Sequence, residues 1–382
     1  MLEAFYTDVC GNVGMGRLLS LGRQVSPTAA RLHRRQVPPA LAPRTHTFPL
    51  RTVAHAVHDR LLRSPSQRYR SHIQWQLSMG RQAERNGFGS ATHLFTMLGE
   101  FPRLISAAKR HGLTVVSEVY TVLSQERILA EERSSFAAWE PGNHDFDAIR
   151  RETPSADVLL SATDHFLCPS DFVRDDLVAN HGVPPSRAAV VPYGVNATWL
   201  ELQPAPVPGR VLFVGSAGLR KGIHYLAMAA ERLVSKRNDL VFRIAGDAEP
   251  EVQRQPICRH LQFLGRVPRH LVQREFERAD VFVLPTLAEG SAEVTYEALA
   301  AGLPVITTRS AGSVVRDGID GRLVPERDPE ALADAINELT EDRALRGRMA
   351  VAARERARQF TWECYGERLL GWLRQVPSGP SA

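Results

Sequence analysis

From residue 210 onward, short apolar runs rich in β-branched residues alternate with amphipathic segments. The runs are RVLFVG (210–215), VFRIAGD (241–247), LQFLGRV (261–267), DVFVLPT (280–286) and LPVITT (303–308). In the segment after the first run, apolar residues recur at helical spacing, namely Ile223, Leu226, Ala227, Ala230, Leu233 and Val234. Alternating strands and helices of this kind predict an α/β fold with a doubly wound parallel sheet.

The first half of the chain repeats this pattern less regularly, with expected strands at LTVVSEV (113–119), DHFLCPS (164–170) and AAVVPYG (188–194). The 382 residues exceed the roughly 250–300 at which a single hydrophobic core stops growing, so we expect two domains that face a cleft. Three prolines, at 204, 206 and 208, favour a short semi-rigid linker between them. The predicted division is a Rossmann-like domain over 1–203, a hinge over 204–209, a second Rossmann-like domain over 210–358, and a closing helix with a flexible tail over 359–382.

The composition argues against membrane-spanning and disulfide-rich classes of protein. The sequence contains no apolar run of about 18 residues or more and no basic-then-apolar start typical of a signal peptide. The cysteines are widely scattered and form no CxxC pair or metal-ligand spacing; they are Cys10, Cys168, Cys258 and Cys364. We therefore expect a soluble, cytoplasmic protein with reduced cysteines and no metal site.

Positive charge is concentrated at the start of the chain. Residues 1–85 contain 13 Arg and no Lys against four acidic residues, Glu3, Asp8, Asp59 and Glu84. Such a face could contact anionic lipid or a phosphate-bearing substrate, and the alternative is a solvated arginine-rich surface. Nucleic acid is disfavoured as a partner because the arginines show no pattern of stacking aromatic residues and no known binding module.

An acidic segment follows the strand predicted at 280–286. Glu289 comes just after this strand, where parallel sheets bind ligands, and the backbone N–H groups of Gly290, Ser291 and Ala292 could face an anion. Glu297 follows eight positions later, roughly 12 Å away if the segment is helical. A phosphate would repel two carboxylates beside it, so we expect them to bind neutral hydroxyls. Sugars and ribose carry such hydroxyls, so the spacing fits a nucleotide-sugar. The alternative is that both are helix-start acids favoured by the helix dipole.

The stretch from 280 to 325 closely resembles the core of the retaining GT-B glycosyltransferases called glycosyl transferases group one. It contains the Glu-x7-Glu signature, the strand sequence Ala-x-Gly-x-Pro-Val-Ile and a Gly-rich loop. The resemblance implies that Glu289 contacts the donor sugar and that Glu297 binds the ribose hydroxyls. It also implies that the backbone of Gly290 and Ser291 faces the sugar-diphosphate.

A second segment, VGSAGLRKGIHYL (214–226), resembles the phosphate-binding entry of the same family. The resemblance implies that Gly215 lies at the donor, that Lys221 binds the diphosphate, and that Arg220 helps to neutralise it. The more usual arginine position directly after the strand glycine is Ser216 here. Lys221 is one of only three lysines beside 44 arginines, which favours a specific role for a compact ammonium at this place.

The resemblance extends over residues 150–376, through the turn at 191–195 and the closing segment FTWE (360–363), and it departs from the family in the first domain. It implies that the first domain lacks its opening strand and helix. GNVGMG (11–16) is interpreted as an ordinary turn because no strand is expected before it. No histidine follows LTVVSEV, where many members carry one near the donor, and the histidines at 93, 111 and 144 are expected to be surface or loop residues.

The implied function is retaining, metal-independent hexosyl transfer from a nucleotide-diphosphate sugar, without a cofactor, with Glu289, Lys221 and Arg220 as catalytic residues. A role in cell-envelope or exopolysaccharide synthesis, a lipid-linked acceptor and peripheral contact with an anionic membrane at its cytoplasmic face are further hypotheses. Two alternatives stay open. One is a non-catalytic or truncated GT-B pseudoenzyme that keeps only donor binding, and the other is a sugar-nucleotide epimerase.

Overall fold

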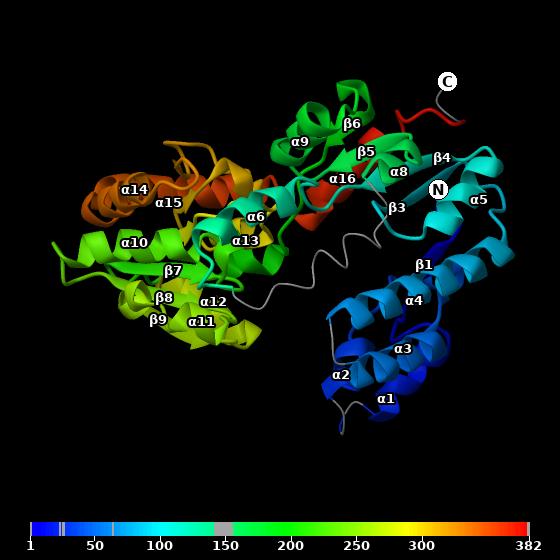
Figure 1. The fold of residues 1–382 in the computed structure, drawn as a ribbon, viewed down its shortest axis with the longest axis horizontal. Helices are drawn as coiled ribbons and strands as arrows, with labels where there is room; N and C mark the ends of the chain where they lie inside the picture. The colour runs from blue at the N-terminus through cyan, green and yellow to red at the C-terminus, as the bar shows by residue number, and fades with distance from the viewer. Residues whose placement is uncertain (1, 23, 25–26, 63–64, 141–155, 380–382) are drawn as a thin grey trace. The chain divides into compact units, whose positions relative to one another are not determined.

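The structure, a computed structural model, describes residues 2–22, 24, 27–62, 65–140 and 156–379. Contacts between Cα atoms divide the chain into two compact units. The first unit comprises Met1–Ser117, His144–His165 and Pro377–Ala382, and the second comprises Glu118–Asn143 and Phe166–Val376. Each unit is described by itself (Figure 1).

The second unit is built on a six-stranded sheet with the order β12-β11-β10-β7-β8-β9, in which all neighbours are parallel. The strands are β7 (Arg210–Val214), β8 (Val241–Ala245), β9 (Leu261–Gly265), β10 (Val281–Leu284), β11 (Val305–Thr307) and β12 (Gly321–Leu323). All five strands expected from the alternation are confirmed. The order reverses between β7 and β10, which makes the gap beside their carboxyl ends the topological switch point of a doubly wound sheet.

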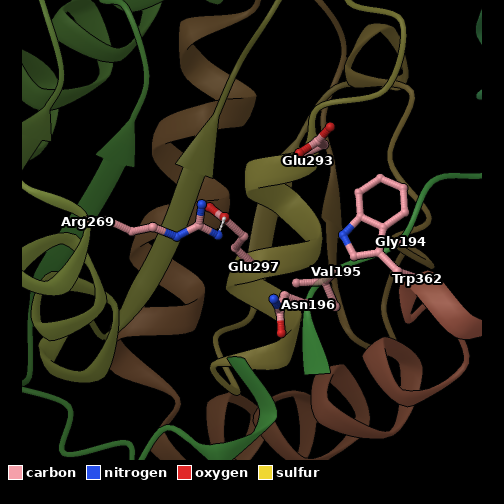
Figure 2. A pocket seen from close by; sticks show the side chains of 7 residues that line it. All are labelled: Gly194, Val195, Asn196, Arg269, Glu293, Glu297 and Trp362. Carbon is pink, nitrogen blue, oxygen red and sulfur yellow. Dashed lines mark ion pairs between the residues drawn. The ribbon is translucent and has the colours of Figure 1, made fainter. Parts of the chain in front are cut away.

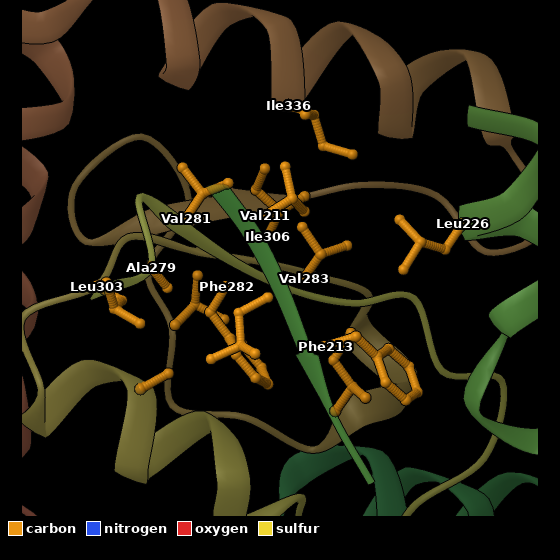
Figure 3. Close-up of a cluster of buried hydrophobic side chains, with 14 of the residues drawn as sticks. Val211, Phe213, Leu226, Ala279, Val281, Phe282, Val283, Leu303, Ile306 and Ile336 are labelled. Atoms are coloured by element: carbon orange, nitrogen blue, oxygen red, sulfur yellow. The ribbon is translucent and has the colours of Figure 1, made fainter. Parts of the chain in front are cut away.

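Helices cover both faces of this sheet. They are α10 (Ile223–Val234), α11 (Pro250–Gln253), α12 (Arg269–Arg278), α13 (Glu293–Ala300), α14 (Pro329–Glu341) and α15 (Arg343–Arg358). Figure 3 shows Val281 and Val283 on the side of Ile336 from α14 and Phe282 on the opposite side, where its ring stacks on Phe276 of α12 with centroids 5.7 Å apart. Because both faces are buried, β10 is an uninterrupted apolar run rather than an alternating one.

The predicted hinge is fixed to the second unit. Ala205 N–H donates to Glu277 O at 2.8 Å, Val207 N–H donates to Arg278 O at 3.0 Å, and Gly209 N–H donates to a carboxylate oxygen of Asp280 at 2.9 Å. Residues 204–209 therefore run along the end of α12 inside one compact unit. The domain boundaries at 203 and 210 stay a prediction.

The segment FTWE begins a closing helix, as predicted. Helix α16 (Trp362–Leu373) starts after Thr361, whose hydroxyl accepts a hydrogen bond from Cys364 N–H at 3.3 Å. Val195 N–H donates to Phe360 O at 2.8 Å, and Trp362 N–H donates to Val195 O at 3.2 Å. These bonds attach the start of α16 to the turn at 191–195. The second unit also contains α6 (Gln125–Ser135), α9 (Asp171–His181), β6 (Ala188–Val190) and all but the first residue of its parallel neighbour β5 (His165–Cys168).

The first unit begins with a parallel pair of short strands, β1 (Phe5–Thr7) and β2 (Thr45–Thr47). The expectation that no strand precedes GNVGMG is therefore wrong, because β1 ends four residues before it. The segment itself leads into a short 3₁₀ helix at Gly14–Leu18.

The remaining elements of the first unit are mostly helices, and strands alternate with helices only from β3 onward. They are α1 (Leu19–Gly22), α2 (Pro27–His33), α3 (Pro49–Leu61), α4 (Pro65–Asn86), β3 (His93–Met97), α5 (Pro102–Arg110), β4 (Thr114–Glu118) and α8 (Ala156–Ser161). The strands expected at 113–119, 164–170 and 188–194 are confirmed as β4, β5 and β6. Among the described residues, no helix combines the length and apolar character needed to cross a bilayer.

Candidate functional site

The central strands of the six-stranded sheet lead into the two predicted binding loops. Val211 pairs with Val281 in the parallel register of β7 and β10, so both strands end at the same edge of the sheet. The loop at 215–222 leaves β7, and the loop at 285–292 leaves β10. Neighbouring strand ends at a switch point are where open α/β sheets bind ligands.

Gly215 allows the side chain of Lys221 to reach this edge. Its φ is +141°, and a Cβ at this position would lie 3.0 Å from Cδ and 3.1 Å from Cε of Lys221. Arg220 and Lys221 belong to a short 3₁₀ helix at Leu219–Lys221. The Arg220 carbonyl accepts hydrogen bonds from Leu287 N–H at 2.9 Å and from the Thr286 hydroxyl at 2.8 Å, which connects the two loops.

Glu289 lies between two cations from the other loop. Its Oε1 atom accepts from the ammonium of Lys221 and lies 2.5 Å from Nη1 of Arg220. Burial by itself would raise the pKa of Glu289, but the two cations outweigh this effect and hold the pKa below its ordinary value. Burial lowers the pKa of Lys221, and Glu289 opposes that shift. With all three groups charged, the cluster carries one net positive charge, which suits an anionic ligand.

The loop that carries Glu289 is held by the segment after β11. Glu289 N–H donates to Ser310 O at 3.0 Å, and the Ser291 hydroxyl donates to Gly312 O at 2.8 Å. Ala292 N–H donates to Ala311 O at 2.9 Å. The expectation of a free amide at Ala292 is therefore wrong, because a carbonyl of the neighbouring loop already occupies it.

Gly290 is required by a close backbone approach. A Cβ at this position would lie 1.7 Å from the carbonyl oxygen of Tyr120, so no larger residue fits without displacing the chain. The Gly290 carbonyl accepts from the Ser170 hydroxyl at 2.6 Å. Gly290 and Ser291 directly follow Glu289 in this loop, and their role at a sugar-diphosphate stays a prediction.

Glu297 lies in a separate cavity of about 250 Å³ (Figure 2). The cavity is lined by Gly194, Val195, Asn196, Arg269, Glu293, Glu297 and Trp362. Burial raises the pKa of Glu297 to about 7, although Arg269 lies 3.8 Å away and opposes the shift. Burial also raises the pKa of Glu293, one helical turn earlier on α13. A carboxyl group in this state can accept or donate hydrogen bonds to ligand hydroxyls near neutral pH.

Sequence reasoning missed most residues of this cavity. Glu293 precedes Glu297 by four positions, so the two side chains lie on the same face of the helix. This spacing is the signal by which the sequence could have identified Glu293. Asn196 and Trp362 come from distant parts of the chain, and no local pattern connects them with Glu297.

The expectation of surface or loop histidines is confirmed for His111, which is exposed in a turn, and is wrong for His93, which belongs to a strand. His111 lies in the first unit, where its Nδ1 atom is 2.9 Å from Ala107 O, and His93 is half-buried at the start of β3. His144 lies outside the described residues. No group of three or more His, Cys, Asp or Glu side chains in the described ranges is arranged to hold a metal ion. The expected independence from metals and cofactors stays a prediction.

Two family models match most of the chain. The model described as Glycosyl transferases group 1 matches residues 208–342, and the model described as Glycosyltransferase Family 4 matches residues 23–199. Together they cover both predicted domains and both binding loops of the second unit.

Individual relatives are also glycosyltransferases by name. The chain is 32% identical over 191 residues to a D-inositol 3-phosphate glycosyltransferase of Corynebacterium urealyticum, a match that covers 46% of this chain and 45% of the relative. It is 26% identical over 305 residues to a glycogen synthase of Mycobacterium tuberculosis, covering 76% of this chain and 72% of the relative. The chain thus spans about half the length of the first relative and more of the second.

Solved structures agree on the fold. The structure of Anabaena Alr3699/HepE in complex with UDP and glucose matches 98% of this chain and 100% of its own, with a TM-score of 0.64 and 13% identity. A sucrose-phosphate synthase from Thermosynechococcus elongatus matches 81% of this chain and 78% of its own, with a TM-score of 0.61 and 20% identity. From the matched family models and the fold shared with solved structures, we conclude that this chain belongs to the group 1 glycosyltransferases with the GT-B fold.

Proposed function

We propose that this protein transfers a sugar from a nucleotide-diphosphate sugar to an acceptor with retention of anomeric configuration. The observation that carries the proposal is the convergence of Lys221 and Arg220 on Glu289 at the switch point between β7 and β10. One buried carboxylate beside two cations provides a polar group for a sugar hydroxyl and a positive site for a diphosphate within the same few ångströms.

The cations can hold a phosphate without losing Glu289. An ammonium has three N–H donors and a guanidinium has five, so Lys221 and Arg220 can each bind a phosphate oxygen and still contact the carboxylate. Each charge-assisted hydrogen bond contributes roughly 1.5–3 kcal/mol. Glu289 then orients the donor sugar through a hydroxyl, and Glu297 binds the ribose hydroxyls from its own cavity.

The proposed chemistry asks little of side chains as acids or bases. The acceptor oxygen attacks the anomeric carbon on the face from which the diphosphate leaves. The bond between the anomeric carbon and the diphosphate oxygen breaks, and the departing diphosphate takes the acceptor proton. Lys221 and Arg220 stabilise the charge that develops on the leaving group, which is electrostatic and positional catalysis. This scheme uses no cofactor and no metal ion.

Two observations support a proposal for the class of acceptor: the arginine excess in the first 85 residues and the names of similar proteins. Among similar proteins are phosphatidyl-myo-inositol mannosyltransferases and a putative colanic acid biosynthesis glycosyltransferase. A cell-envelope or exopolysaccharide role with a lipid-linked or anionic acceptor agrees with the arginine excess of residues 1–85. Such an acceptor would bring the protein to the cytoplasmic face of an anionic membrane.

Calorimetry with uridine, guanosine, thymidine and adenosine diphosphate sugars tests the donor site. We expect one donor to bind the full-length protein and both Lys221→Ala and Glu297→Ala to abolish the binding. Lys236→Ala is the matched control, because Lys236 is an exposed lysine after α10 and should leave the affinity unchanged.

Calorimetry together with analysis of the reaction products separates the alternatives. Binding without transfer to any acceptor would favour the non-catalytic interpretation, and no binding by a well-folded protein would overturn the donor site itself. Release of an epimerised nucleotide-sugar would favour the epimerase. The anomeric configuration of a transferred sugar decides between retention and inversion.

A further inference from the structure

Helix α3 (Pro49–Leu61) packs on α4 through polar side chains. The ring of His55 stacks on Trp75 of α4 with centroids 5.3 Å apart, and His55 Nδ1 lies 3.2 Å from the Ser71 hydroxyl oxygen. Asp59 is half-buried and shares this face of the helix with His55, since they are one turn apart. The two helices lie side by side in the first unit (Figure 1).

The opposite face of α3 is apolar and exposed. Leu50, Val53, Val57 and Leu61 are 70%, 52%, 55% and 75% exposed. Their spacing of three, four and four residues places them in one stripe along the helix, which we call the α3 stripe. Nine of the nineteen large exposed apolar side chains in the described residues fall within the first 61 positions, so this exposure is concentrated rather than scattered.

Basic side chains flank the α3 stripe on both sides. At 3.6 residues per turn, Arg60 lies along one edge and Arg51 and His58 lie along the other. Arg51 and His58, with Arg70 of α4, line a hollow of about 590 Å³ beside the stripe. The only acid of α3, Asp59, points to the α4 side instead. An apolar stripe with cationic edges is the arrangement of helices that lie in a membrane interface.

We infer that the α3 stripe docks on an anionic lipid membrane, with its four apolar side chains among the acyl chains and the flanking arginines on lipid phosphates. The charge of the first 85 residues, 13 Arg against four acids, identifies a negatively charged partner. A second copy of the chain is disfavoured, because pairing two such faces would bring arginine-rich surfaces together. The inference extends the proposed membrane contact by naming its surface, and it does not depend on donor binding.

Vesicle co-sedimentation with the full-length protein tests this surface. We expect binding to vesicles of equal parts phosphatidylcholine and phosphatidylglycerol, weaker binding at high salt, and little binding to phosphatidylcholine alone. Replacing both Val53 and Val57 by Asp should weaken binding by about tenfold or more, because buried apolar area is lost. Arg60→Glu should weaken it by about fivefold or more at low salt.

Val351→Asp is the matched control, since Val351 is also exposed, at 66%, but belongs to α15 of the second unit. Because all three valines are exposed, the variants should unfold at the wild-type temperature. Equal vesicle binding by wild type and the Val53→Asp, Val57→Asp variant would overturn the inference. The inference would also be overturned if light scattering showed that the wild type is a dimer and this variant a monomer, while the wild type did not bind vesicles. Donor affinity, measured separately, should not change in any of these variants.

Discussion

The Nε2 atom of His224 lies 2.7 Å from Oε1 of Glu132, and both side chains are buried. This contact joins α10 to α6. Tyr225 O–H donates to the same carboxylate oxygen at 2.6 Å, and Arg327 Nε donates to the other oxygen at 2.8 Å. Burial by itself would raise the pKa of Glu132, but these hydrogen bonds outweigh it and lower the pKa to about 2. An ionised carboxylate therefore holds α6 against α10 within the second unit.

Glu132→Ala should reduce the free energy of unfolding by about 2–3 kcal/mol, because it leaves buried donors without an acceptor. Glu131→Ala is the control, since Glu131 is largely exposed and lies 3.5 Å from Arg327 in a solvated pair. That change should stay within about 0.5 kcal/mol. Urea unfolding at neutral pH measures both, and equal effects would contradict a special role for the buried carboxylate.

Stability should fall on acidification in two steps. Burial lowers the pKa of His224 below 6.5, so below pH 6.5 the unfolded state binds more protons than the folded state. The pKa of Glu132 falls from 4.5 to about 2, so its contribution is present above 4.5 and is lost as the pH falls towards 2. Urea midpoints across this range should show both steps. Glu132→Gln should lack the lower one, and a flat profile in the wild type would refute the assignment.

Glu289→Gln should slow sugar transfer about a hundredfold while the folded structure persists. The amide keeps the size of the side chain but removes the negative charge that organises Lys221 and Arg220. Steady-state rates with the donor identified by calorimetry provide the measurement. Glu249→Gln, an exposed position before α11, serves as the control and should retain full activity. Unchanged rates in Glu289→Gln would remove Glu289 from the catalytic residues.

Donor affinity should increase as the pH rises through about 7, the value to which burial raises the pKa of Glu297. Above this value the group is mainly an ionised carboxylate, which accepts hydrogen bonds from ribose hydroxyls more strongly than the neutral acid. Calorimetric titrations at several pH values should show the change, and Glu297→Gln should abolish it. The same slope in both proteins would assign the pH dependence to another group.

Gly290→Ala should reduce the free energy of unfolding by about 1–3 kcal/mol and impair donor binding, since the new Cβ would overlap the Tyr120 carbonyl. Gly347→Ala is the control because nothing lies within 4 Å of its Cβ position on α15. That substitution should increase stability by about 0.5–1 kcal/mol through helix propensity. Thermal unfolding and calorimetry compare the two variants, and similar behaviour would argue against a close approach at Gly290.

Local patterns predicted the strands of the sheet, and the family resemblance predicted which residues meet at its edge. The apolar runs of β7 and β10 predicted two strands of a parallel sheet, and a ligand site at their carboxyl ends follows from the rules of such sheets. That the two strands are neighbours is known from the structure. The family resemblance then assigned Lys221 and Glu289 to one site, and the structure brings them together. Each strand could be predicted because it depends on a local run of residues. The contact between the two loops was expected only from the family resemblance, because it joins segments 68 residues apart.

Features that depend on contacts between distant parts of the chain could not be predicted from local sequence patterns. The amide of Ala292 was predicted to be free, but the carbonyl of Ala311 comes from a separate loop and occupies it. The pairing of Glu132 with His224 has no sequence signature either, since the two residues lie on helices separated by several strands. β1 was missed because a three-residue strand is too short to show a period.

The bonds between Val195 and the start of α16 also set an order of events during synthesis. The partners of Val195 lie at residues 360 and 362, so they leave the ribosome long after the turn at 191–195 has emerged. Trp362 also lines the cavity around Glu297. A nascent chain that already contains the whole six-stranded sheet therefore still lacks one wall of this cavity, and it gains that wall only when the closing helix docks.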